Sequence, residues 1–339
     1  MEIATQAPSR SDKHKWLMSS HMVHPFYRYT PLLDLHKTIR LIALFPSTGL
    51  YDSKCSCYLV EAPVHNLPPF EAVSYFWGDV RDQNHAIVLD QYVGLAYGNN
   101  IHRSPRTERS TFPLTETLAR ILADLTPESG LRLLWIDAIC IDQSNKLEKA
   151  AQIPMMGQIY SMATRVVICF PGLCPHHVVN ARIAVDKLRS WRHKIHETRE
   201  LLVREEGTEG VASLDGGMVG LRPDERHPED ELFICCCRMD SLKELLHQPW
   251  FSRVWTVQEV VLAREAVIRA GGEELDWRAA EEACGVALDL NMQDLMDFIT
   301  IVDIGKLRTG ISTRSEQTNC ASDINQHIHT KEDEVLRSL

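Results

Sequence analysis

The chain has 339 residues, 44% of them hydrophobic and 24% charged, which is ordinary for a soluble globular protein. Its formal net charge of −10 argues against a general nucleic-acid binder, because phosphate recognition needs a basic face. No apolar run approaches the roughly 18 residues that a membrane span requires, and the N-terminus lacks an apolar secretory core. We therefore expect a cytoplasmic protein of one or two domains.

The cysteines are expected to be reduced thiols, because no secretory signal is read. A zinc site needs paired ligand clusters, and neither Cys55-Ser56-Cys57 nor the run Cys235–Cys237 has that spacing. Cys140 lies in an apolar segment without a histidine nearby in sequence, which favours a core residue over a nucleophile. No metal site is predicted.

The first segments predict a flexible N-terminus followed by strands. Residues 1–26 are polar and are expected to be flexible. Ile39–Phe45 and Cys55–Val60 predict an antiparallel hairpin that covers one edge of the main sheet. Phe70–Trp77 predicts a further strand, and Gly78 permits a sharp exit into the loop that starts at Asp79.

An insertion is predicted at about residues 90–113, and Gly94 to Thr111 should form a loop within it. Thr115 can cap the helix that follows. The apolar face of that helix comprises Leu114, Leu118, Ile121, Leu122 and Leu125.

The centre of the chain predicts a strand, a helix and a second strand. Leu133–Ile141 is a nearly unbroken apolar run typical of a buried strand. Ser144 or Asn145 can cap the helix, which Pro154 should kink or divide. Arg165–Phe170 predicts the second strand. Such a unit is the crossover of a parallel sheet.

Acidic and amide side chains mark this unit. Asp142 and Gln143 lie where open α/β sheets place ligands, but they can equally cap the following helix. Asp137 is expected to be structural, because an acid inside an apolar strand must find hydrogen-bond donors.

A second insertion is predicted at about residues 175–240. It contains a helix over 178–204 and a Gly-, Glu-, Asp- and Pro-rich stretch over 205–230. Ser241 can cap a short helix after it.

Pro249 opens another helical segment, with Val254, Val257 and Val261 on its buried side. Trp255 and Glu259 are four residues apart and share another face. From its residue type alone, Glu259 can be a solvated partner of a nearby cation, for which the candidates are Arg253, Arg264 and Lys243.

The last part predicts a hairpin, from Ala266–Ala270 and Leu275–Trp277, and a further helix from Trp277 onward. Residues 281–339 are predicted to form a helical and polar tail.

Three stretches together resemble one family. FEAVSYFWGD (70–79), LLWIDAICIDQSNKLEKAAQIPMMGQIYSMATRVVICFPG (133–172) and PWFSRVWTVQEVVLA (249–263) are similar to the three blocks of the fungal heterokaryon-incompatibility (HET) domain. The resemblance covers residues 27–280. The chain departs from the family at Asp142, where asparagine is usual, at Pro154, and at the CFPG ending of the second block.

HET domains are remotely similar to Toll/interleukin-1 receptor (TIR) domains. The resemblance and the predicted elements together imply an α/β fold with a mainly parallel, flavodoxin- or TIR-like sheet flanked by helices. An N-terminal β-hairpin and large insertions complete the expected architecture.

In TIR domains that hydrolyse NAD, a glutamate in the last of these helices is catalytic, so the resemblance implies Glu259 as the catalytic residue. NAD would be a substrate, and no cofactor is required. The implied binding residues are Ser74, Tyr75, Trp77, Gly78, Asp79, Asp142, Gln143 and Trp255. Trp77, Trp135 and Trp255 can instead be core residues.

The family resemblance implies a role in nonself recognition and programmed cell death, with self-association or binding to other HET and nonself-recognition proteins. Three hypotheses remain open: a NAD glycohydrolase, a non-catalytic homotypic signalling module, and a truncated, inactive family member.

Overall fold

The computed structural model describes residues 26–46, 56–78, 85–90, 94–97, 100–103, 109–206, 236–253 and 255–289. The chain divides into two compact units. The first unit comprises Met1–Glu71 and Trp77–Met155, and the second comprises Ala72–Phe76 and Met156–Leu339.

The first unit is built on a sheet with the strand order β8-β1-β2-β4-β7, and β5 pairs with β2 and β6. Its core centres on β1, where Ile39 to Leu44 are at most 1% exposed. The strands are β1 (Thr38–Phe45), β2 (Ser56–Pro63), β4 (His85–Asp90), β5 (Gly94–Tyr97), β6 (Asn100–Arg103), β7 (Arg109–Leu114) and β8 (Arg132–Trp135).

Two helices of the first unit begin where the sequence predicts caps. Thr115 accepts a hydrogen bond from the Leu118 amide and caps α2. Asn145 accepts from two amides and caps α4. Pro154 divides the expected long helix, because it lies in the 3-10 turn that separates α4 from α5. The helices are η1 (Val64–Asn66), α2 (Glu116–Leu125), α3 (Asp137–Cys140), α4 (Lys146–Gln152) and η2 (Ile153–Met155).

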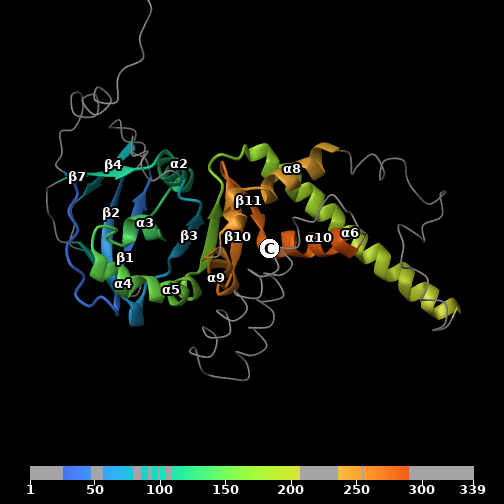
Figure 1. Ribbon diagram of the computed structural model, residues 1–339, viewed down its shortest axis with the longest axis horizontal. Helices are drawn as coiled ribbons and strands as arrows, with labels where there is room; N and C mark the ends of the chain where they lie inside the picture. The colour runs from blue at the N-terminus through green and yellow to red at the C-terminus, as the bar shows by residue number, and fades with distance from the viewer. Residues whose placement is uncertain are drawn as a thin grey trace, which may run out of the picture. The chain divides into compact units, whose positions relative to one another are not determined.

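The second unit contains the strand order β11-β10-β9-β3, with helices α6, α8 and α10 packed together (Figure 1). The structure confirms three predicted elements of this unit: the hairpin that begins at Ala266, the helix over 178–204 and the helix that begins at Trp277. The elements are β3 (Glu71–Tyr75, its first residue belonging to the first unit), α5 (Met156–Met162), β9 (Arg165–Cys169), α6 (Pro175–Glu206), α8 (Cys236–Leu246), η4 (Pro249–Ser252), α9 (Trp255–Val261), β10 (Ala266–Ala270), β11 (Glu273–Asp276) and α10 (Trp277–Asp289).

The prediction of a mainly parallel sheet is wrong, because antiparallel pairs predominate among the pairings described. Antiparallel pairs are β1–β2, β1–β8, β4–β7, β5–β6 and β10–β11. Parallel pairs are β2–β4, β2–β5 and β9–β10. The fold is therefore α/β with a mixed sheet flanked by helices. The prediction extended one crossover unit to the whole sheet, whereas hairpins supply many of the strands.

Three local predictions are also corrected. The β1–β2 hairpin forms but does not cover an edge, since β8 flanks β1 and β4 flanks β2. The buried strand ends at Trp135, and Asp137–Cys140 is a short helix. Gly94 to Thr111 contains strands β5 and β6 and the start of β7 instead of a loop.

At the C-terminal side, Ser241 lies inside α8 instead of capping it. The helix α10 continues through residue 280, where the sequence placed a boundary. Three predicted regions lie outside the described residues: the N-terminus before residue 26, which the sequence predicts to be flexible, the stretch 207–235 and the tail beyond 289. Within the described part of the chain, no helix combines the length and apolarity needed to cross a bilayer.

The β10–β11 turn offers a matched pair of glycines for a stability test. Gly271 and Gly272 have φ values of 56° and 88°, which side chains rarely adopt. A Cβ on Gly271 would lie 2.3 Å from Pro175 Cγ, whereas one on Gly272 would meet no atom within 4 Å. We expect Gly272→Ala to cost about 1–2 kcal/mol of backbone strain, and Gly271→Ala about 1–3 kcal/mol more from the steric clash. Urea unfolding checks this, and equal costs would contradict the packing of this turn on α6.

Candidate functional site

The strand β3 carries a buried serine in the second unit. Ala72, Val73, Ser74 and Tyr75 are all at most 3% exposed, so both faces of the strand are covered. A hydroxyl in such a position needs hydrogen-bond partners. Ser74 Oγ donates to Glu259 Oε2 from α9, which lies 185 residues further along the chain. Two separate sequence motifs thus meet at this contact.

Trp250 in η4 completes the arrangement. Its indole Nε1 donates to Ser74 Oγ at 2.6 Å. An indole N–H is only a donor, so the serine oxygen must accept from it. The single hydroxyl proton of Ser74 is then left for the Glu259 carboxylate. Hydrogen bonding therefore runs in one direction, from Trp250 through Ser74 to Glu259.

Aromatic rings fix the position of Trp250. Its ring centroid lies 4.9 Å from that of Phe251, 5.9 Å from that of Trp277 and 6.2 Å from that of Phe170, all at steep interplanar angles of 64° to 86°. Edge-to-face contacts of this kind are favourable. Because Trp250 is fully buried among them, its N–H has one direction in which to donate.

The helix α9 is held by a contact just before its first turn and by packing along one side. Arg253, just before it, donates from Nη1 to the carbonyl oxygen of Tyr75, the last residue of β3. On its other side α9 packs against α5, where Gly157 allows a close approach. A Cβ on Gly157 would lie 2.6 Å from Gln258 Nε2 and 3.1 Å from Leu262 Cδ1. These contacts set the position of Glu259.

Glu259 is 3% exposed. The reading of this residue as a solvated partner of a surface cation is therefore wrong. The sequence placed Glu259 on a different face from the apolar residues of its helix, but the Glu259 side chain is buried as well. Desolvation of a carboxylate is costly unless donors satisfy it, and the Ser74 hydroxyl is one such donor.

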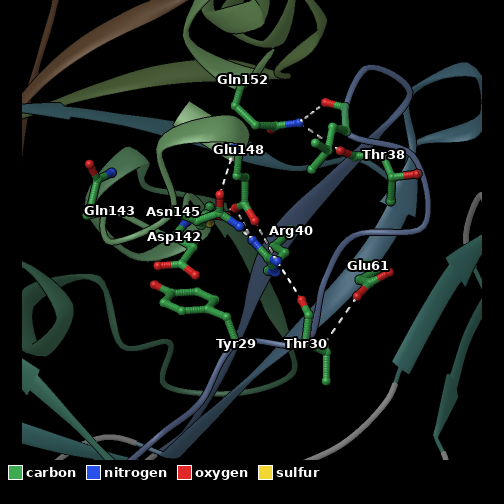
Figure 2. A network of polar contacts seen from close by, with 12 residues as sticks. Tyr29, Thr30, Thr38, Arg40, Glu61, Asp142, Gln143, Asn145, Glu148 and Gln152 are labelled. Carbon is green, nitrogen blue, oxygen red and sulfur yellow. Dashed lines mark hydrogen bonds and ion pairs between the residues drawn. The ribbon is translucent and has the colours of Figure 1, made fainter. Parts of the chain in front are cut away.

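The first unit contains its own buried glutamate, shown in Figure 2. Arg40 of β1 and Glu148 of α4 are both 1% exposed. Their two-point contact joins Nη1 to Oε1 and Nη2 to Oε2, the latter pair 3.1 Å apart. The Asp142 amide donates to Glu148 Oε1 at 2.8 Å. Bidentate contacts of this type are the strong form of the arginine–carboxylate interaction.

Arg40 also fastens the segment before β1. Its Nη2 donates to the Thr30 carbonyl at 2.7 Å, and its guanidinium carbon lies 4.9 Å from the centre of the Tyr29 ring. Nη1 further donates to the Cys140 carbonyl at 3.2 Å. Sequence reasoning did not single out Arg40 or Glu148. An arginine inside the apolar run IRLIALF was the signal available, because a buried guanidinium requires a partner.

Asp142 and Gln143 belong to the turn beside this network. Asp142 Oδ1 accepts from the Ser144 amide at 3.0 Å and from its hydroxyl at 2.6 Å. Gln143 Nε2 donates to the Asp137 carbonyl at 2.9 Å. Neither caps α4, since Asn145 does so, and both side chains are engaged in the local turn.

Other predicted residues are placed as follows. Trp77 is half-buried and Gly78 has a φ of 70°; both belong to the first unit, whereas Ser74, Tyr75 and Glu259 belong to the second. Asp79 lies outside the described residues, as does the side chain of Trp255. Burial raises the pKa of the Cys140 thiol to about 12, which leaves it protonated and unsuited to nucleophilic attack.

The fold and the site define an α/β protein with a mixed sheet, in which separated motifs supply a buried tryptophan–serine–glutamate chain. The chain belongs to the family described as heterokaryon incompatibility protein (HET), whose model matches residues 70–259. That match confirms the resemblance inferred from the three motifs. It includes β3, η4 and α9, which carry Ser74, Trp250 and Glu259.

A relative supports the same family. "Heterokaryon incompatibility protein 6, OR allele" of Neurospora crassa is 28% identical over 257 residues. The alignment covers 72% of this chain and 35% of the relative, so the chain spans about a third of that protein's length. No solved structure matches the chain.

The Arg40–Glu148 pair gives a stability prediction. Removing one partner, as in Arg40→Met or Glu148→Leu, strands a buried charge and should cost about 3–5 kcal/mol. The double variant strands no charge and should be much less destabilised than the sum of the two single variants. Urea unfolding of the four proteins measures this. Additive costs would contradict a direct, buried ion pair.

Proposed function

We propose that this protein acts in fungal nonself recognition, as a cytoplasmic signalling module whose engagement leads to regulated cell death. Membership of the HET family supports the proposal, and so does the relative named for heterokaryon incompatibility. The partner would be another nonself-recognition protein or a second copy of this chain.

One observation favours a signalling module over an enzyme in this conformation. A catalytic carboxylate has to reach its substrate. Glu259 is 3% exposed, and Ser74 and Trp250, which are linked to it, are at most 1% exposed. The hydrogen bonds from Trp250 to Ser74 and from Ser74 to Glu259 instead tie β3, η4 and α9 together. In the module, Glu259 supports the fold that partners recognise.

Expression of Glu259→Gln in fungal cells tests the module. Glutamine has nearly the shape of glutamate and its carbonyl oxygen can still accept from Ser74. We expect Glu259→Gln to kill cells as the wild type does, when both are expressed at the same level and are folded. Glu265→Gln, which changes an exposed glutamate six residues away, is the matched control. Loss of killing by a folded Glu259→Gln, with Glu265→Gln unaffected, would refute the non-catalytic module.

A second candidate function is hydrolysis of NAD at the bond between nicotinamide and ribose. The contact between Ser74 and Glu259 supports it, because the family resemblance implies that these two residues belong to one site. Water would add its hydroxyl to the anomeric carbon and release its other proton to solvent. Nicotinamide would leave with the bonding electron pair, which neutralises its ring nitrogen.

Glu259 would have a defined role in this reaction. The transition state of glycosidic cleavage resembles an oxocarbenium ion, so a carboxylate beside the ribose stabilises the developing positive charge. The Ser74 hydroxyl, fixed by Trp250, would position that carboxylate. Opening of the site would have to precede substrate binding, since Glu259 is buried.

Incubation of the purified chain with NAD tests the enzyme. We expect nicotinamide release by the wild type and a loss of about 100-fold or more in Glu259→Gln, as for removal of a group that stabilises charge in a transition state. Glu265→Gln should release nicotinamide as the wild type does. The absence of release even when the protein is concentrated or clustered would reject this candidate.

A further inference from the structure

Arg253 contacts three segments of the candidate site. Its backbone amide donates to the Trp250 carbonyl of η4 at 3.2 Å. Its own carbonyl accepts from the hydroxyl of Thr256, in the first turn of α9. Its side chain donates to the Tyr75 carbonyl at the end of β3. A single residue therefore joins η4, α9 and β3.

We infer that Arg253 is a latch that keeps Glu259 sequestered. While its guanidinium binds the Tyr75 carbonyl, α9 is held against β3 and the Glu259 carboxylate stays on Ser74. When the guanidinium lets go, α9 moves away from β3 and the carboxylate becomes accessible to molecules in solution.

Among the contacts named here, the one made by the Arg253 side chain should open at least cost, because Arg253 is the least buried of these residues. Thr256 and Ser74 are 1% exposed and Trp250 is completely buried. Arg253, in contrast, is half-buried, so its charge can return to water when the hydrogen bond breaks. Local opening occurs where few buried contacts are lost.

The aromatic contacts of Trp250 indicate that α9 moves and η4 stays in place. Trp250 is packed against Phe251, Phe170 and Trp277, which fixes η4 in the second unit. The helix α9 is only seven residues long, and the side chain of Gln258, which faces Gly157 of α5, is long enough to adjust when α9 moves. Opening should therefore break the Ser74–Glu259 contact and preserve the Trp250–Ser74 contact.

The latch extends the second candidate function and rests on it, because exposure of the Glu259 carboxylate serves catalysis. Its physical content is independent of turnover. A latch that holds without NAD hydrolysis would refute the enzyme alone, and NAD hydrolysis without a latch would refute the inference alone.

Carbodiimide labelling of Glu259 in the full chain tests the latch. The reagent activates an accessible carboxylate, which glycine ethyl ester then traps as an amide. Glu259 is the only carboxylate between Arg253 and Arg264, so tandem mass spectrometry assigns the label. The exposed Glu265 serves as the internal reference. We expect wild-type Glu259 to label far more slowly than Glu265.

Arg253→Ala should raise labelling of Glu259 on the order of 10- to 100-fold, the range for loss of a hydrogen bond to a charged group. Arg264→Ala is the matched control, because Arg264 Nε donates to the Ser161 carbonyl at 3.1 Å on the other side of α9. Labelling of Arg253→Ala at the rate of Arg264→Ala would overturn the latch, as would wild-type labelling as fast as that of Glu265.

Hydrogen exchange of the wild type provides a measurement that needs no variant. The α9 amides should exchange faster than the β9 amides. Their exchange should occur through a local opening, so low concentrations of urea should change its rate little. Exchange of α9 only through global unfolding would overturn the inference.

Discussion

A buried carboxylate must be held by donors, and this constraint organises both units of the protein. In the first unit Glu148 is bound by the Arg40 guanidinium and the Asp142 amide, which ties α4 to β1. In the second unit Glu259 accepts from Ser74, which ties α9 to β3. Breaking either arrangement leaves a polar group without its partner in a region from which water is excluded. Each glutamate therefore fixes a helix to a strand that lies far away in sequence.

The two glutamates differ in what their surroundings allow. Glu148 is held in a bidentate ion pair with a cation that also binds two backbone carbonyls, so it is committed to structure. The contact described for Glu259 is with a neutral hydroxyl whose direction is set by an indole behind it. Under the latch that we infer, the half-buried Arg253 would hold Glu259 out of solution in this arrangement. The family motifs supply the residues of this second arrangement.

Local chemistry predicted much of the fold from sequence. The caps at Thr115 and Asn145 and the break at Pro154 depend on neighbouring residues, which is why they are found where expected. The pairing of the strands was harder to predict from sequence, because it joins residues far apart in the chain and one crossover unit does not determine it. The sequence predicted a strand that continues beyond Trp135. The helix Asp137–Cys140 that follows buries Ile139 and Cys140, so its sequence is as apolar as that of a buried strand. The partner of Arg40 lies 108 residues away, and no local pattern pointed to it. For Glu259, the resemblance implied the residue, but Ser74, which donates to it, lies 185 residues earlier.

The direct test of the account is a double-mutant cycle between Ser74 and Glu259. The free energy of unfolding of the wild type, Ser74→Ala, Glu259→Leu and the double variant would be measured in urea under one set of conditions, because leucine removes the acceptor that glutamine would retain. If the Ser74 hydroxyl donates to a buried carboxylate, the two changes should be coupled by about 1–3 kcal/mol, the range for a hydrogen bond to a charged group. Additive changes, with a coupling within about 0.3 kcal/mol of zero, would contradict the contact on which the candidate site is built.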